Sequence, residues 1–548
     1  MTTAIHYTSI NLANAGKEIF GLQVAISSWI KSYFRYSQQE KFNFLVGDAK
    51  DWDEVKIMAA EAKLDPSRLV ALDRRYAREN FGHFDTIFRP DPHVQNILWQ
   101  RQQVSGAAFN FCGLAHAIGG LETGDLLERY CLTPSDENDA IVCPSHAVRS
   151  AISAFWDNYS AYLQQRFGTY FKCPVQLPII PLGIDIERYE AISTPAKRSD
   201  QRQKLGFKDD DIVLLWVGRL SHAIKAHPLP MFQAAERAAE KTGATVHLVM
   251  VGYFVPDDAG PMFQALAADI CKKAKVHFIA NNDPRFPEGL WAAGDIFLSL
   301  IDNMQESFGL TPIEAMAAGL PRVISDWDGY RDSVTDGEDG FLIRTTQPPP
   351  GNGRALSELL LSGKEMYGGF LAKSALSVAV DYEMATEAII KLIQDKNKRK
   401  SMAEKAHKRV RPTYSWQSII PAYEALWKEM SNKRKAKPHQ KVWPSALPQV
   451  PDPYTMYLSY PTAPLLETTK LTVMASTDEI KSLWKHEINI FGLDMMITPD
   501  EATKLINYVS GQTNCTISNI LQQFKSNDRA SLWRTVAWLL KLGILKAA

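Results

Sequence analysis

Two glutamates, Glu306 and Glu314, lie in the segment ESFGLTPIEAMAAGLP with seven residues between them. The segment predicts a helix with Thr311 as its N-cap, Pro312 in its first position and Gly319 at its end. A helix start presents free backbone N–H groups and the positive end of a dipole, which suit a phosphate. A sugar nucleotide needs this combination, because its hydroxyls require carboxylate acceptors and its diphosphate requires donors. The alternative for Glu314 is half of a capping box.

A second candidate group is basic and follows a predicted strand. Ile212–Val217 is a continuous apolar run, typical of a parallel strand covered on both faces. Gly218, Arg219 and Leu220 follow it, and Lys225 comes shortly afterwards. An arginine offers a planar fork to phosphate oxygens and a lysine offers a point charge. Surface placement is the alternative for any cation, but the strand–Gly–Arg context favours a diphosphate site.

Together, the E-x7-E pattern and the G-R-L…K pattern resemble the retaining glycosyltransferases of family GT4, the glycosyl transferases group 1. The resemblance covers roughly the first 430 residues. It implies an α/β chain with the GT-B fold, in which two Rossmann-like domains face each other across a cleft. It also implies a nucleotide-diphospho-sugar donor, transfer of a hexose with retention, no bound metal and no other cofactor.

The resemblance assigns roles to individual residues. Arg219 and Lys225 would neutralise the departing diphosphate, Glu306 would hold sugar hydroxyls, and Glu314 would hold the ribose. His116, which follows a predicted strand, would face the sugar from the first domain. The expected catalytic residues are therefore His116, Arg219, Lys225 and Glu306. The expected donor-binding residues are Gly21, Arg219, Lys225, Asn282, Glu306, Phe308, Gly309, Leu310, Thr311 and Glu314.

Several of these positions keep a structural alternative. Gly21 stands where family members often have two glycines, and a turn or helix-packing role is equally open. His116 could be a structural histidine, and Ser145, after the strand DAIVC, could be a plain N-cap. Asn282 lies where related enzymes often contact the nucleotide base.

The pair Asp326 and Asp328 forms an Asp-x-Asp pattern, which indicates a metal site in another large glycosyltransferase fold. Here the pair follows a predicted strand, where the resembling enzymes have a small loop that is often Gly-Gly. We therefore do not assign a metal to it. Trp327, Asp328 and Gly329 depart from the family at this loop, and the departure could alter the fit of donor or acceptor.

The composition bounds the class of protein. The 548 residues predict more than one domain, and 61 basic against 61 acidic residues give no net charge that would favour nucleic acid or an anionic membrane. The six scattered cysteines indicate reduced thiols rather than a zinc site or a disulfide framework. No unbroken apolar run is long enough for a membrane span, and no signal peptide is recognised. We expect a cytoplasmic enzyme, with peripheral contact at the inner membrane surface left open.

The predicted domain order has four parts. An acceptor-side Rossmann-like domain covers 1–190, and a nucleotide-sugar domain with a closing helix covers 191–430. A basic and then Pro-rich linker covers 431–466, and 467–548 is similar to a winged-helix domain. Few basic residues of the last predicted helix share one face, which favours a protein or peptide partner over nucleic acid.

Two rival functions remain at this point. A sugar-nucleotide-sensing regulator would use the tail to bind DNA or a peptide, and a GT-B epimerase would change the sugar without an acceptor. The acceptor could be a glycan, a lipid-linked sugar or a peptide. The sequence does not fix the base or sugar of the donor, the linkage, the partner of the tail or the oligomeric state.

Overall fold

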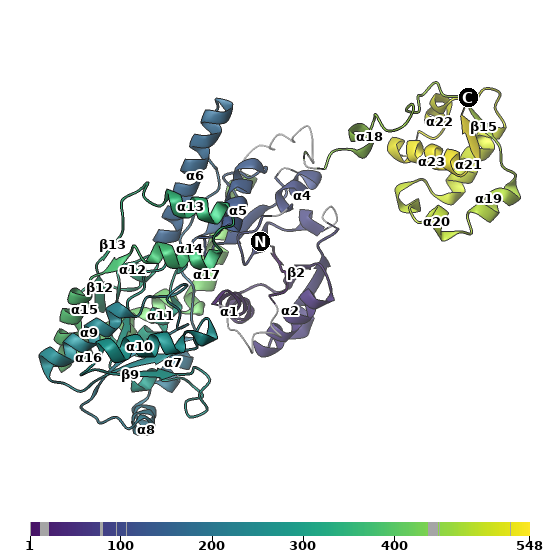
Figure 1. Cartoon of the computed structure of the whole chain (residues 1–548). Helices are drawn as coiled ribbons and strands as arrows, with labels where there is room; N and C mark the ends of the chain where they lie inside the picture. The colour runs from purple at the N-terminus through teal and green to yellow at the C-terminus, as the bar shows by residue number, and fades with distance from the viewer. Residues whose placement is uncertain are drawn as a thin grey trace. The chain divides into compact units, whose positions relative to one another are not determined.

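The computed structural model describes residues 2–10, 21–76, 80–94, 96–105, 107–436, 448, 450–525 and 528–547. The chain forms two compact units, 1–446 and 447–548, and each is described by itself (Figure 1). The larger unit contains two six-stranded sheets, and the smaller unit is mainly helical.

The first sheet is parallel and has the strand order β3-β2-β1-β4-β5-β6. Ile5 of β1 lies opposite Phe44 of β2 and Phe88 of β4, so the strand order reverses at β1. In open α/β sheets, ligands bind outside the carboxyl ends of the strands at such a reversal. The strands are β1 (Thr3–His6), β2 (Phe42–Val46), β3 (Leu69–Asp73), β4 (Thr86–Arg89), β5 (Asn110–Leu114) and β6 (Ala140–Val142).

Helices cover this sheet, and two of them begin at side-chain caps that fix where they start. Asp48 accepts a hydrogen bond from the Asp51 backbone N–H, and Ser145 accepts one from the Val148 N–H. The helices are α1 (Gly21–Tyr36), α2 (Ala49–Glu61), α4 (Ile97–Val104), α5 (Leu121–Leu132) and α6 (His146–Phe167), with short 3-10 turns η2 (Pro66–Arg68) and η3 (Phe81–His83).

The second sheet is also parallel, with the order β12-β11-β10-β7-β8-β9. Here the strand order reverses at β7, which lies between β10 and β8. Its strands are β7 (Ile212–Val217), β8 (Val246–Val251), β9 (Lys275–Ile279), β10 (Ile296–Ser299), β11 (Arg322–Ser325) and β12 (Gly340–Ile343), and β13 (Thr345–Thr346) pairs with β14 (Ala379–Val380) as a separate antiparallel ribbon.

The second sheet is surrounded by a longer set of helices. They are α7 (Ile186–Ile192), α8 (Pro195–Leu205), α9 (Leu229–Thr242), α10 (Gly260–Ile270), α11 (Leu310–Ala317), α12 (Tyr330–Ser333), α13 (Arg354–Leu361), α14 (Tyr367–Ala375), α15 (Tyr382–Gln394) and α16 (Lys396–Tyr414), with η4 (Asp257–Ala259) and η5 (Trp291–Ala293). Two Rossmann-like sheets in one compact unit confirm the predicted GT-B fold.

The carboxyl edges of the two sheets meet directly. Ser145, which follows β6, donates its hydroxyl to the carbonyl of Ser307, 2.7 Å away, in the segment after β10. The neighbouring His146 N–H donates to Asp332 at 2.8 Å. Ser145 is therefore both the N-cap of α6 and a contact to the segment after β10.

The chain crosses between the two Rossmann-like parts twice, and the two crossings touch. The first precedes α7, and the second lies between α16 and α17 (Trp416–Lys435). The Ile184 N–H donates to the Tyr414 carbonyl at 2.9 Å, which joins them. Asp185 caps α7 by accepting a hydrogen bond from the Arg188 N–H.

The last helix of this unit, α17, packs back onto the first sheet. Tyr423 and Trp427 are fully buried and lie against Trp29 of α1 and Phe88 of β4, with ring centroids 5.3 to 6.3 Å apart. The core of the first Rossmann-like part is therefore completed by residues near the end of the unit. The helix continues to Lys435, beyond the predicted start of the linker.

The smaller unit has its own apolar core. Three of its helices, Pro499–Ser510, Ile517–Gln523 and Arg529–Lys541, contribute buried side chains to this core, and capping boxes start the first two. Its elements are α18 (Pro453–Met456), β15 (Leu471–Val473), α19 (Thr477–Leu483), α20 (Glu487–Ile490), η6 (Leu493–Met495), α21 (Pro499–Ser510), α22 (Ile517–Gln523), α23 (Arg529–Lys541) and β16 (Leu545–Ala547), of which β15 and β16 pair antiparallel.

A histidine cluster lies at the amino ends of β7, β8 and β9, on the edge opposite the cleft. His247 Nε2 is 3.2 Å from an Asp211 carboxylate oxygen, and His247 Nδ1 is 2.9 Å from His277 Nε2. The ring of Phe207 packs on His247 with centroids 3.9 Å apart. Burial lowers the pKa of His247, and burial together with the charges of His247 and Lys275 lowers the pKa of His277 to about 4.

This cluster predicts a loss of stability on acidification. Below pH 6.5 the unfolded imidazoles bind protons that the folded His277 resists, so the unfolding free energy should fall as the pH drops from 6.5 towards 4. At pH 5 the loss at His277 should reach about 2 kcal/mol. His277→Gln should flatten the dependence of the denaturation midpoint between pH 7.5 and pH 5, and the exposed His83→Gln should not. An equal slope in both variants would contradict this assignment.

Candidate active site

Three loops converge at the carboxyl ends of β7, β10 and β11, because β10 lies between the other two strands in the sheet. The fully buried Asn303 joins them. Its side-chain amide donates to the Ala223 carbonyl at 2.7 Å, and its backbone carbonyl accepts from Trp327 Nε1 at 3.1 Å. Its side-chain oxygen also accepts from the Gln305 N–H at 3.0 Å. One residue thus fixes the loops that carry most of the predicted donor site.

Lys225 and Glu306 form an ion pair within this loop cluster. Their side chains are 14% and 18% exposed, so the pair is largely removed from water. Burial opposes both charges, yet the Glu306 carboxylate holds the pKa of Lys225 above its usual value. Lys225, and then Arg219, hold the pKa of Glu306 below its usual value despite the same burial. Both groups are therefore charged at neutral pH.

Arg219 is the third member of the cluster. It is half-buried and interacts electrostatically with both Lys225 and Glu306. Within the described residues its guanidinium has no hydrogen-bond or ion-pair partner. Two cations and one carboxylate leave a net positive charge, with one fork of N–H donors open to a ligand. This arrangement suits a diphosphate joined to a hydroxyl-bearing group.

Helix α11 starts two residues earlier than the sequence predicts. It begins at Leu310, its N-cap is Gly309 with φ +89°, and no side chain caps it. A Cβ at Gly309 would lie 2.2 Å from a ring carbon of Tyr330, so the position requires glycine. The predicted N-cap role of Thr311 is wrong, because Thr311 is the second residue of the helix. Its hydroxyl lies 3.4 Å from the Tyr330 hydroxyl. The predicted end of the helix at Gly319, with φ +74°, is confirmed.

The missing side-chain cap has a chemical consequence. The first N–H groups of α11 lack the intrahelical partner and the side-chain acceptor that a capped helix supplies. Phe308, Gly309, Leu310 and Thr311 therefore surround a helix start that favours an anion, beside the Lys225–Glu306 pair. The anion site at this helix start stays a prediction, although the helix begins two residues earlier than the sequence indicates.

Glu314 lies one turn into α11 and contacts α7, the helix that follows the first chain crossing. Its Oε1 accepts a hydrogen bond from the Tyr189 hydroxyl of α7 at 2.6 Å, and burial raises the pKa of its carboxyl. The capping-box alternative is wrong, because the N-cap is a glycine without a hydroxyl. The ribose role of Glu314 stays a prediction. Sequence reasoning did not single out Tyr189, since its partner is 125 positions away.

His116 follows β5 on the first sheet. Its Nε2 donates to the Pro90 carbonyl at 2.8 Å, and burial lowers the pKa of the imidazole, so the ring is neutral. The nearby Arg89 is buried and contacts Asp91 at 2.6 Å and His6 at 2.9 Å. In the described part of the chain, these contacts do not join His116 to the Arg219–Lys225–Glu306 cluster.

Two other predicted donor residues lie outside the cluster. Gly21 is the first residue of α1, and the loop before it, 11–20, lies outside the described residues, so its role stays a prediction. Asn282 is exposed after β9. Near it, at the carboxyl ends of β7, β8 and β9, is a cavity of about 340 Å³. The cavity is lined by Leu220, Gly252, Tyr253, Phe254, Asp257, Phe278, Ile279 and Ala280, and not by Asn282.

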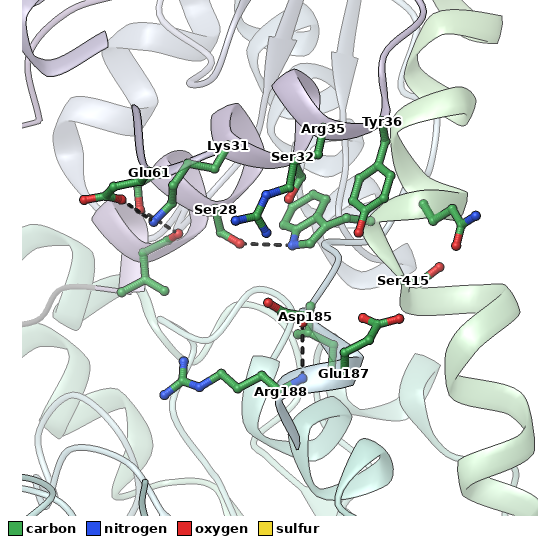
Figure 2. A pocket seen from close by; sticks show the side chains of 15 residues that line it. Ser28, Lys31, Ser32, Arg35, Tyr36, Glu61, Asp185, Glu187, Arg188 and Ser415 are labelled. Carbon is green, nitrogen blue, oxygen red and sulfur yellow. Dashed lines mark hydrogen bonds and ion pairs between the residues drawn. The ribbon is translucent and has the colours of Figure 1, made fainter. Parts of the chain in front are cut away.

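A larger cavity of about 500 Å³ lies between α1, the first crossing and the start of α17 (Figure 2). Lys31 pairs with Glu61 at 3.0 Å on one side, and Trp416 Nε1 donates to Ser28 at 3.0 Å across it. No predicted donor residue lines it. Because both chain crossings contribute to its wall, a change in the angle between the two Rossmann-like parts would change its shape.

Two searches of the described residues bear on the chemistry. No group of three or more His, Cys, Asp or Glu side chains is placed to hold a metal ion within these ranges. None of the described helices is both long and apolar enough to cross a membrane.

Comparison with known proteins gives a family match for part of the chain. Residues 197–366 match the family Glycosyl transferases group 1. This range contains the Arg219–Lys225–Glu306 cluster and α11. The match lies within the second Rossmann-like part of the chain.

Individual relatives match different shares of the chain. A D-inositol 3-phosphate glycosyltransferase of Geodermatophilus obscurus is 28% identical over 333 residues, which cover 58% of this chain and 70% of that protein. The protein of the same name from Rhodococcus erythropolis is 30% identical over 179 residues, 32% of this chain and 38% of that one. Among solved structures, Anabaena HepE in complex with UDP and glucose has a TM-score of 0.48 at 16% identity, covering 78% of this chain and 100% of that chain.

Proposed function

We propose that this chain transfers a hexose from a nucleotide-diphospho-sugar to an acceptor, with retention of the anomeric configuration and without a bound metal. The observation that carries the proposal is the buried cluster of Arg219, Lys225 and Glu306 beside the uncapped start of α11. The family match of 197–366, which contains this cluster, supports the same reaction class. The free state of the six cysteines supports a reducing compartment such as the cytoplasm.

The cluster can divide the work of the reaction. Arg219 and Lys225 would stabilise the negative charge that develops on the leaving diphosphate. Release of Lys225 towards the phosphate would free the Glu306 carboxylate to accept hydrogen bonds from sugar hydroxyls. The bond from the anomeric carbon to the phosphate oxygen breaks while the bond to the acceptor oxygen forms on the same face. The acceptor proton then passes to the departing phosphate oxygen, so no protein nucleophile is needed.

The 340 Å³ cavity is our candidate for the nucleotide base. It lies at the carboxyl ends of three strands of the second sheet, the same edge as Arg219. Tyr253, Phe254 and Phe278 contribute aromatic surface to it, and a planar base packs well on such surface.

The acceptor is proposed only at the level of its class. The relatives from Geodermatophilus and Rhodococcus carry the name D-inositol 3-phosphate glycosyltransferase, so a phosphorylated polyol joins glycans, lipid-linked sugars and peptides as an acceptor to test. Exposed Ile488 and Phe491 around α20 support a protein or peptide partner for the smaller unit.

The test begins with a panel of nucleotide sugars, scored by thermal shift and by release of nucleoside diphosphate. The preferred donor is then incubated with each acceptor class, and the anomeric configuration of the product is read by NMR. Activity that survives exhaustive EDTA treatment supports metal independence. Loss of activity that Mn²⁺ or Mg²⁺ restores would overturn that part, and a changed sugar without any acceptor would indicate an epimerase.

A chain ending at Ala446 tests the role of the smaller unit. We expect it to keep donor binding and slow donor hydrolysis, because the cluster and the base cavity lie within 1–446. It should lose efficiency only towards the natural acceptor. The cut avoids α17, whose Arg434 donates to the Ala107 carbonyl at 2.6 Å. A folded truncated protein that binds no sugar nucleotide would contradict this division.

A further inference from the structure

Asp328 adopts an unusual backbone conformation in the loop between β11 and α12. Its φ is +38°, one of three positive values at non-glycine residues in the described chain, with Lys63 and Asn514. A residue with a Cβ is disfavoured in this region, whereas glycine enters it freely. The presence of a side chain at such a position indicates that the side chain has a function.

The Asp328 carboxyl is only half satisfied. Its Oδ1 accepts a hydrogen bond from the Tyr330 N–H at 3.1 Å, which shapes the turn into α12. Its Oδ2 is buried and has no hydrogen-bond partner among the described residues. A buried polar atom without a partner is unfavourable and is uncommon in folded proteins. The turn uses one oxygen, so the second is open to a partner beyond the described residues.

The loop that carries Asp328 packs on the donor-site loops. Trp327 donates to the Asn303 carbonyl, and a Cβ at Gly329 would lie 2.5 Å from the Phe308 Cα atom. Asp328 also interacts electrostatically with Glu306 and Lys225. Its unsatisfied oxygen therefore belongs to the same buried group as the Lys225–Glu306 ion pair.

The surroundings also set the form of the carboxyl. Burial, and then the charge of Glu306, raise the pKa of Asp328 well above its ordinary value. Glu306 is charged and can only accept hydrogen bonds, whereas a protonated Asp328 can also donate one. A sugar hydroxyl can both donate and accept. The charged Glu306 carboxylate and the protonated Asp328 carboxyl can therefore each hold one of two neighbouring hydroxyls.

We propose that Asp328 is a further donor-binding residue, whose Oδ2 binds a hydroxyl of the transferred sugar beside a hydroxyl bound by Glu306. The inference rests on the proposed function and deepens it. It assigns the donor to hexoses with two adjacent free hydroxyls. Sugars in which one of these hydroxyls is removed would leave Oδ2 buried without a partner.

The experiment compares wild type with Asp328→Gly and Asp328→Asn. Each is assayed for kcat and KM with the preferred donor of the panel and with its monodeoxy analogues, and for binding of the nucleoside diphosphate alone. We expect KM for the intact donor to rise about tenfold in Asp328→Gly, as for the loss of one hydrogen bond. Discrimination against one particular deoxy sugar should disappear, and nucleoside diphosphate binding should not change.

Stability separates this role from a structural one. Asp328→Asn keeps an acceptor for the Tyr330 N–H and should unfold at the wild-type temperature, whereas in Asp328→Gly the loss of that hydrogen bond is offset by relief of the backbone strain. Lys63, whose φ is +58°, is far from Asp328 in the sequence. Lys63→Gly is therefore the matched control, and it should keep the wild-type discrimination against the deoxy sugar. Lower stability of Asp328→Gly with unchanged discrimination would overturn the proposal alone. A wild type that binds no sugar nucleotide would overturn the proposed function as well.

Discussion

Replacing Arg219 by alanine should lower kcat/KM for sugar transfer by at least about 100-fold while leaving the stability of the protein unchanged. Within the described residues the guanidinium has no hydrogen-bond or ion-pair partner, and its attraction to Glu306 is opposed by its repulsion from Lys225. Each charge-assisted hydrogen bond to a phosphate contributes about 1.5–3 kcal/mol, and a bidentate arginine makes two. Steady-state kinetics and thermal unfolding measure the two expectations separately.

Arg354→Ala is the control for this experiment. Its side chain is 86% exposed on α13 and pairs only with Glu358 on the same helix, at 2.9 Å. Surface pairs of this kind contribute little, so both kinetics and stability should stay at wild-type values. If Arg219→Ala transfers sugar at the wild-type rate, the assignment of Arg219 to the diphosphate is wrong.

The buried ion pair gives the second large effect, and here stability changes too. Lys225→Met leaves the Glu306 carboxylate buried without its partner, and Glu306→Gln leaves the Lys225 ammonium in the same state. Breaking one side of a buried pair costs about 3–5 kcal/mol of unfolding free energy. Each single variant should also lose nearly all transfer activity, since both groups are assigned to the donor.

The double variant Lys225→Met with Glu306→Gln distinguishes stability from function. With both charges gone it should recover most of the lost stability, measured by chemical denaturation, and none of the activity. The matched control is the exposed pair Lys197 and Glu288, with side chains 44% and 45% exposed, whose variants should change stability by less than about 1 kcal/mol. Additive losses at Lys225 and Glu306 would show that the pair is not coupled.

Local signals predicted much of this structure. The apolar run Ile212–Val217 has the same bounds as β7, because a strand buried on both faces needs an unbroken apolar sequence. The motifs also placed Arg219, Lys225 and Glu306 correctly at the ends of strands. These residues come together because parallel strands of one sheet end at one edge.

The features that the sequence did not predict depend on distant partners. The start of α11 differs because Gly309 fits under the ring of Tyr330, a contact that residue preferences for N-caps do not include. Asn303 connects loops around positions 223 and 327, and Tyr189 reaches Glu314 from another helix. The position of Asn303 just after a buried strand was the available signal for it.

The return of α17 to the first sheet has a consequence for how this protein is made. The contact between Ser37 and Glu424 spans 387 positions, and Tyr423 and Trp427 fill the core around Trp29 and Phe88. At ribosomal rates of about 5–20 residues per second, the first sheet waits roughly 20 to 80 s for these side chains. During that interval its apolar surface faces water, so we expect the nascent chain to be prone to aggregation at this stage.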